Sequence, residues 1–138
     1  MNPVVAEWVS KAEGDFATLE RECRARRRPN HDAACFHAQQ CAEKYLKARL
    51  VVADLPVPKI HNLTALLDRV LPVEPLWEVF RPTLAYLSVF AVAARYPGDS
   101  LERHDALEAL RCCKSFRTAA RSALRFANGN ARRKPRRK

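Results

Sequence analysis

The sequence predicts an all-α protein, an up-and-down helical bundle of four long helices and one short helix. First, the chain contains only 3 glycines and 8% aromatic residues, with abundant alanine and leucine, which favours helices over sheets. Second, apolar residues recur at three- and four-residue spacings, the period of an amphipathic helix. Third, proline- and glycine-bearing steps separate these segments, and none of them shows the alternation typical of a strand.

The first two helices are indicated by their ends. Proline is tolerated in the first helical turn, so we expect the first helix to begin at Pro3 and to end at the arginine-rich run 24–28. The second helix is expected to follow a cap at Asn30 or Asp32 and to run to about Ala53.

The second helix combines an apolar stripe with polar residues. Small side chains dominate the stripe, which allows a neighbouring helix to approach closely; its members are Ala34, Ala38, Cys41, Ala42, Tyr45, Leu46 and Ala48. The polar residues are Gln39, Gln40, Glu43, Lys44 and Lys47. Glu43 and Lys47 are spaced as a helical ion pair, which contributes about 0.3–0.5 kcal/mol when exposed. By pattern alone, the polar residues indicate a solvated surface.

Prolines delimit the next two helices. A short third helix is expected from about Asn62 to Val70, after the proline-bearing loop 55–58. The fourth helix is expected over 76–94, with Pro82 either kinking it or delaying its start.

The fifth helix is expected to begin after a cap at Ser100 and to end near Ala127, because an Asn-Gly-Asn step follows at 128–130. The sequence therefore predicts one helical domain, residues 1–127, and a basic disordered tail, residues 128–138. The tail contains six basic residues and no acidic residue. It either keeps the protein soluble or attracts nucleic-acid phosphates.

Charge, cysteines and hydropathy restrict the class of protein. The net charge is +10, of which residues 132–138 supply six, so residues 1–131 carry +4, a modestly basic balance that suits an anionic partner. The five cysteines include no C-x-x-C pair, and the N-terminus is not of the secretory type, so we expect reduced thiols and a cytoplasmic location. No apolar run is long enough to span a membrane. Neither a glycine-rich phosphate loop nor a serine nucleophile elbow is present, which excludes many enzyme classes.

Metal binding is not expected, and neither is a cofactor. His37 and Cys41 are four residues apart on one helical face, as in half of a zinc site, but a second pair with matching spacing is missing. The cysteines are expected to be buried as small apolar side chains.

Three signals in order resemble the HEPN family. The second helix contains A-Q-Q-C-A-E-K-Y-L-K-A at 38–48, His-Asn-Leu follows a proline-bearing loop at 61–63, and Arg-Tyr-Pro stands at 95–97. The resemblance covers about residues 3–127. It implies a four-helix bundle with a short additional helix.

In family members with ribonuclease activity, an arginine near Arg95 stabilises the transferring phosphate, and a histidine that follows after four to six intervening residues supplies acid–base chemistry. Those later positions hold Ser100, Leu101 and Glu102, and His104 comes two residues too late. The motif is therefore incomplete unless His104 turns back toward Arg95. Alternatively, Arg95 only neutralises the carbonyl groups at a helix end.

Arg26 and His31 show a similar spacing, but they lie between the first two helices, where the family has no active site. We expect a coincidence of the arginine-rich run, with an RNA contact as the alternative.

The resemblance also implies a groove that binds a nucleotide or RNA. Its predicted residues are Gln40, Glu43, Lys44, Lys47, His61, Arg95, Tyr96 and Asp99. His61 is alternatively a capping or packing residue of the third helix. Tyr96 is expected to stack on a base or to be a target of modification. Asp99 is expected to hold Arg95 in place or to take part in coordinating a cation, or else only to form the turn.

The function implied is that of a toxin-type protein in a two-gene module. Small relatives are typically encoded beside a minimal nucleotidyltransferase, which acts as the antitoxin. A homodimer is expected, with two copies of Arg95 around one cleft. The incomplete motif favours binding of a nucleotide or RNA without turnover. The alternatives are a metal-independent ribonuclease that uses Arg95 with His104, and a noncatalytic scaffold subunit for the nucleotidyltransferase.

Overall fold

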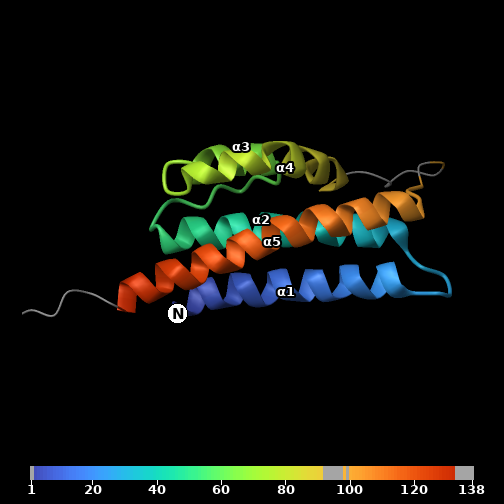
Figure 1. Ribbon diagram of the computed structural model, residues 1–138, viewed down its shortest axis with the longest axis horizontal. Helices are drawn as coiled ribbons and strands as arrows, with labels where there is room; N and C mark the ends of the chain where they lie inside the picture. Colours follow the sequence, from blue (N-terminus) through green and yellow to red (C-terminus); the bar gives the residue numbers. More distant parts are fainter. Residues whose placement is uncertain (1, 92–97, 99, 133–138) are drawn as a thin grey trace, which may run out of the picture.

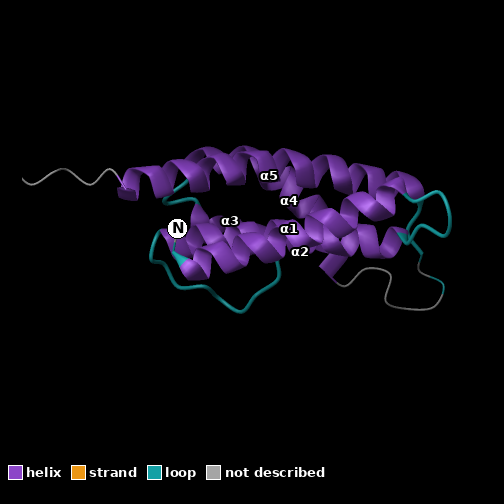
Figure 2. Ribbon diagram, turned by 90° about the horizontal axis from the view of Figure 1, so that it is seen from below, coloured by secondary structure: helices purple, strands orange, loops and turns teal. Residues whose placement is uncertain are grey.

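The computed structural model describes residues 2–91, 98 and 100–132, with side chains up to residue 127. These residues form helices and no strand, which confirms the all-α class. Three long helices lie side by side, and two short helices cover one flank (Figure 1); they are α1 (Pro3–Arg24), α2 (His31–Val52) and α5 (Arg103–Arg132), with α3 (Leu63–Val70) and α4 (Arg81–Ser88). In the view at right angles, α5 runs along one whole side of the bundle (Figure 2).

The first three helices each begin after an asparagine, of which the sequence indicated only Asn30 as a cap, with Asp32 as the alternative. The side-chain oxygens of Asn2, Asn30 and Asn62 each accept a hydrogen bond from a backbone N–H of the following turn, at 2.8, 2.9 and 3.0 Å. Each cap satisfies a donor that the helix itself leaves free, and such a cap stabilises a helix by about 1 kcal/mol.

Helix α2 is the centre of the bundle, because α1, α3 and α5 all pack against it. The whole apolar stripe is buried, with each of its side chains at most 1% exposed. At the level of Phe116, the aromatic rings of Trp77 and Phe80 pack edge-on against α5, with centroids 5.1 and 5.4 Å from the Phe116 ring.

The fourth helix differs from the expected continuous segment. Described residues form a 3₁₀ helix η1 (Pro75–Phe80), then α4, then a second 3₁₀ helix η2 (Val89–Ala91); the remainder of the expected helix lies outside the described residues. Pro82 lacks the N–H that an α-helical turn would use, and its ring would clash with the carbonyl group four residues earlier. The α-helix therefore starts at Arg81, with Pro82 in its first turn.

Both ends of α5 also differ from expectation. The helix begins at Arg103 rather than after Ser100, because the Asp105 carboxylate accepts a hydrogen bond from the Glu102 backbone N–H at 2.8 Å and caps this end. It continues to Arg132, so the expected end at Ala127 is wrong. One glycine costs a helix only about 1 kcal/mol relative to alanine, which does not stop a long helix by itself.

A polar cluster joins α1, α2 and α5 beside the core. The buried Tyr45 hydroxyl donates to Glu13 at 2.5 Å, and Arg117 donates two hydrogen bonds to the same carboxylate at 2.7 and 2.5 Å. The hydrogen bonds from Arg117 are the main reason that the pKa of Glu13 is lowered. Burial raises the pKa of Tyr45, so its hydroxyl remains a donor.

All five cysteines carry free thiols, and only Cys23 is partly exposed. Burial raises the pKa of Cys35 to about 12, so this thiol is a packing group rather than a nucleophile. None of the helices in the described part of the chain is long and apolar enough to cross a membrane.

Replacing Ala38 by leucine tests the close packing around α2. Ala38 is fully buried, and the larger side chain has no space, so Ala38→Leu is expected to lower the free energy of unfolding by about 1–3 kcal/mol. Ala17→Leu is the matched control, since Ala17 is exposed on α1 and should change stability by less than about 0.5 kcal/mol. Urea denaturation measures both variants, and equal effects would contradict the packing described.

Candidate functional site

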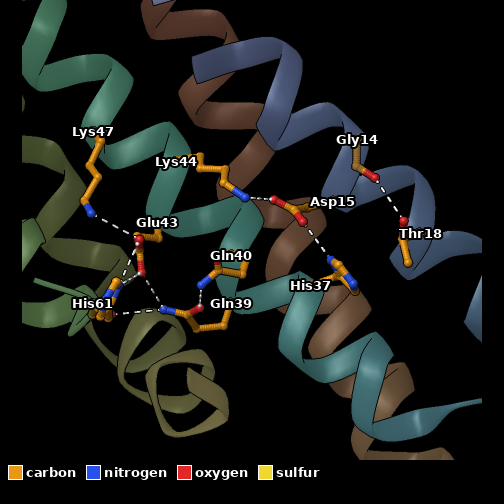
Figure 3. A network of polar contacts seen from close by, with 10 residues as sticks. All are labelled: Gly14, Asp15, Thr18, His37, Gln39, Gln40, Glu43, Lys44, Lys47 and His61. Carbon is orange, nitrogen blue, oxygen red and sulfur yellow. Dashed lines mark hydrogen bonds and ion pairs between the residues drawn. The ribbon is translucent and has the colours of Figure 1, made fainter. Parts of the chain in front are cut away.

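The buried Glu43 carboxylate is the centre of a polar network at mid-height of α2. Glu43 is 5% exposed. It accepts hydrogen bonds from Lys47 at 3.1 Å and from the side-chain amide of Gln39 at 3.1 Å, and His61 Nδ1 lies 3.0 and 3.2 Å from its two oxygens (Figure 3). A buried carboxylate needs such donors to replace its lost hydration. The interpretation of the polar residues of α2 as a solvated surface is therefore wrong for Gln39, Glu43 and Lys47, which are buried.

Gln39 connects this network to the loop before α3. Its amide N–H groups donate to Glu43 and to the backbone carbonyl oxygen of His61, the latter at 3.0 Å, and its oxygen accepts from Gln40 at 2.7 Å. Gln39 is fully buried and was missing from the predicted site. Its position four residues before Glu43, on the same helical face, was the available signal.

His61 is held at two points on α2 while its ring remains accessible. Its backbone carbonyl is bound by Gln39 and its Nδ1 faces Glu43, yet 70% of its side chain is exposed. Because an ionised carboxylate only accepts hydrogen bonds, Nδ1 carries the proton and Nε2 is left as an acceptor. Of the two roles considered for His61, the structure places it beside Glu43, while Asn62 supplies the cap of α3.

Lys47 supports Glu43 from inside the bundle. Its side chain is 7% exposed, and its ammonium nitrogen lies 5.9 Å from the centre of the Trp8 ring on α1. The charge is therefore balanced by the carboxylate and the aromatic ring together. Lys47 has little surface of its own with which to contact a ligand.

Lys44 belongs to a second cluster, which joins α2 to α1. Its ammonium group forms an ion pair with Asp15, and the same carboxylate lies 2.7 Å from His37 Nδ1 (Figure 3). Asp15 is 8% exposed, so its charge is balanced by these two donors. Sequence reasoning missed Asp15, since nothing in α1 indicated which acidic residue faces α2.

Of the remaining predicted residues, the structure describes only His104. Arg95, Tyr96 and Asp99 lie outside the described residues. His104 stands in the first turn of α5 and is 76% exposed, with ring nitrogens 3.3 Å from Glu102 and 3.4 Å from Asp105. Pairing of His104 with Arg95 stays a prediction.

The part of the chain that the structure describes contains no group of three His, Cys, Asp or Glu side chains arranged to hold a metal ion. His37 is occupied by Asp15, and Cys41 is fully buried.

Comparison with known proteins identifies the family. The family model described as HEPN domain matches residues 5–123, most of the chain. The chain belongs to the HEPN family. The crystal structure of ST0689, an archaeal HEPN homologue, shares the fold, with a TM-score of 0.65 and 21% identity over 87% of this chain and 97% of that chain. No curated protein gave a significant match.

For this HEPN protein, the family signal and the buried network coincide. Gln39, Glu43 and Lys47 lie within the A-Q-Q-C-A-E-K-Y-L-K-A segment of α2, and His61 belongs to the second signal. The two signals are thus joined by direct hydrogen bonds, through the side chains of Gln39 and Glu43. The arrangement presents one imidazole in a fixed orientation.

Removing the Lys47 charge tests how strongly the network depends on burial. Lys47→Met leaves Glu43 buried with one donor fewer, so we expect the free energy of unfolding to fall by about 3 kcal/mol. Lys11→Met is the matched control, because Lys11 and Glu7 have the same spacing on α1 but are 62% and 69% exposed, and the expected loss is below about 1 kcal/mol. Denaturant titration compares them; a Lys47→Met effect as small as the control would contradict a buried network.

Proposed function

We propose that this HEPN protein binds a nucleotide or RNA without cleaving it, with the exposed ring of His61 as part of the contact surface. The observation that carries the proposal is the fixed orientation of His61 on Glu43 and Gln39. A side chain held in this way loses little conformational freedom when a ligand binds. The net charge of +10 favours a polyanionic ligand.

Several of the other predicted residues have supporting roles in this proposal. Glu43 fixes the tautomer of His61, Lys47 balances the charge of Glu43, and Gln40 orients the amide of Gln39. Lys44 joins α1 to α2 through Asp15. Arg95, Tyr96 and Asp99 are proposed as further ligand contacts, on the HEPN resemblance alone.

A ribonuclease is the second candidate, and one observation favours it. His104 is largely exposed and lies beside two carboxylates, a setting in which an imidazole can exchange protons. In that reading Arg95 stabilises the phosphate, and His104 replaces the histidine that the motif lacks at positions 100–102.

We also propose a protein partner, either a second copy of the chain or a minimal nucleotidyltransferase acting as antitoxin in the cytoplasm. Support comes from three large apolar side chains that face solvent on η1 and η2: Leu76 is 85%, Val79 73% and Val89 56% exposed. Large apolar side chains exposed in this way are available for a contact with a partner. If the partner binds without any nucleotide, the protein is a scaffold subunit.

His61→Ala tests the proposed binding surface. Fluorescence anisotropy with labelled single-stranded RNA, in the presence of a metal chelator, should show binding by the wild type and about tenfold weaker binding by His61→Ala, as expected for loss of one hydrogen bond that Nε2 accepts from a ribose hydroxyl or a base N–H. Arg69→Gln, an exposed change on α3, is the control and should bind as the wild type does.

Gel electrophoresis of the same RNA distinguishes the alternatives. Intact RNA is expected. Cleavage that disappears in both Arg95→Ala and His104→Ala would establish the ribonuclease instead. Absence of binding, together with a tight complex with a co-expressed neighbouring nucleotidyltransferase, would support the scaffold.

A further inference from the structure

A basic region lies at one end of the bundle, where the connection between α1 and α2 meets the start of α5 (Figure 1). A hollow of about 690 Å³ opens there. Its lining comes from the end of α1, the connection, and the first residues of α2 and α5: Cys23, Arg24, Ala25, Arg26, Pro29, His31 and Arg103. Three of these seven residues are arginines.

Two of these arginines have no carboxylate partner. Arg26 and Arg103 form no ion pair within 4 Å in the described part of the chain, whereas Arg24 forms an ion pair with Glu20 at 3.3 Å. Nearby acids are used elsewhere: Glu22 accepts from the Asn30 backbone N–H at 2.8 Å, and Asp32 accepts from the Leu101 backbone N–H at 2.9 Å. The carboxylates thus fix the backbone around the hollow and leave both guanidinium groups available.

The position of Arg103 is unfavourable for the fold itself. It is the first residue of α5, where the helix dipole already places positive charge and where acidic side chains are preferred. His31 is likewise the first residue of α2. Two long helices therefore direct their positive ends toward the region that contains the unpaired arginines, an arrangement that favours an anion.

His31 adds a hydrogen-bond donor to the wall. Its Nδ1 is buried without a hydrogen-bond partner. A buried nitrogen without a partner is tolerated best in the unprotonated form, which places the proton on Nε2. Cys23 is not a nucleophile here, because burial raises the pKa of its thiol. The hollow is therefore suited to binding rather than to covalent chemistry.

We propose that this hollow is a binding site for a chain of adjacent phosphate groups, as in a free polyphosphate or the triphosphate of a nucleotide. A planar guanidinium group binds two phosphate oxygens at once, and two such groups, Arg26 of the connection and Arg103 of α5, suit neighbouring phosphates. Among the described residues that line the hollow there is no phenylalanine, tyrosine or tryptophan to form a stacking platform for bases, which favours a polyphosphate over single-stranded RNA. His31 and Glu43 are separated by about 18 Å along α2, so this site does not depend on the surface proposed around His61.

Inorganic tripolyphosphate tests the proposal by thermal unfolding of the full-length protein. At a concentration about tenfold above its Kd, tripolyphosphate should raise the Tm of the wild type by about 5 °C. Orthophosphate at equal ionic strength should raise it far less. The double variant Arg26→Gln/Arg103→Gln should bind at least about tenfold more weakly. Its Tm without ligand should not fall, since neither arginine forms an ion pair in the described chain.

The control is the charge-matched double variant Arg69→Gln/Arg125→Gln, in which both arginines are exposed elsewhere on the bundle. It should respond to tripolyphosphate as the wild type does, and so should His61→Ala. The proposal is overturned if the control loses the response equally, if the wild type shows none, if Arg26→Gln/Arg103→Gln unfolds more easily without ligand, or if RNA binds in the hollow and tripolyphosphate does not.

Discussion

The burial of the Glu43 carboxylate is the constraint on which the rest of the candidate site depends. Helix α2 is covered by α1, α3 and α5, and twelve of its 22 residues are buried, Gln39, Glu43 and Lys47 among them. Little of their surface is open to water, so most of their partners must come from the protein. Lys47 supplies a charge, Gln39 an amide and the loop before α3 an imidazole. The position of His61 follows from this need for donors.

Helix α2 carries two polar clusters with different effects. The Asp15–His37–Lys44 cluster connects α2 to α1 and contributes to the bundle itself. The Gln39–Glu43–His61 cluster connects α2 to a loop and leaves a ring nitrogen accessible. A network in which every buried group is paired is rigid, and rigidity lowers the entropic cost of binding. The helix that centres the core thus also orients the residue that we propose contacts the ligand.

Local signals in the sequence were sufficient for much of the fold. The apolar stripe of α2 and its cap at Asn30 depend on neighbouring residues, and both were predicted, the cap with Asp32 as the alternative. Pro82 was recognised as a disturbance, but only the structure shows that a 3₁₀ helix precedes it. The predicted end of α5 was wrong because Gly129 was taken to terminate the helix. The free-energy cost of one glycine in a helix is small compared with the stability of a long packed helix.

The candidate site was predicted less completely, because its contacts join residues far apart in the chain. The pair Glu43 and Lys47 was visible from its spacing, but its burial depends on Trp8 and on the loop of His61, which no local pattern fixes. Lys44 has the same residue type and neighbourhood as Lys47, yet it faces Asp15 on α1. The helix shows polar residues on more than one side, and only tertiary packing decides which of them are solvated.

The tautomer of His61 provides the most direct measurement of the central claim that a buried carboxylate fixes an exposed imidazole. Nitrogen-15 NMR at about pH 8, where an ordinary imidazole is neutral, separates the two forms. The native protein is expected to show His61 protonated at Nδ1 and hydrogen-bonded there. The same protein in denaturant should show the mixture of the two neutral tautomers that a free histidine side chain adopts. If His61 gives that mixture in the native protein too, Glu43 does not hold it, and the proposed role of the network is refuted.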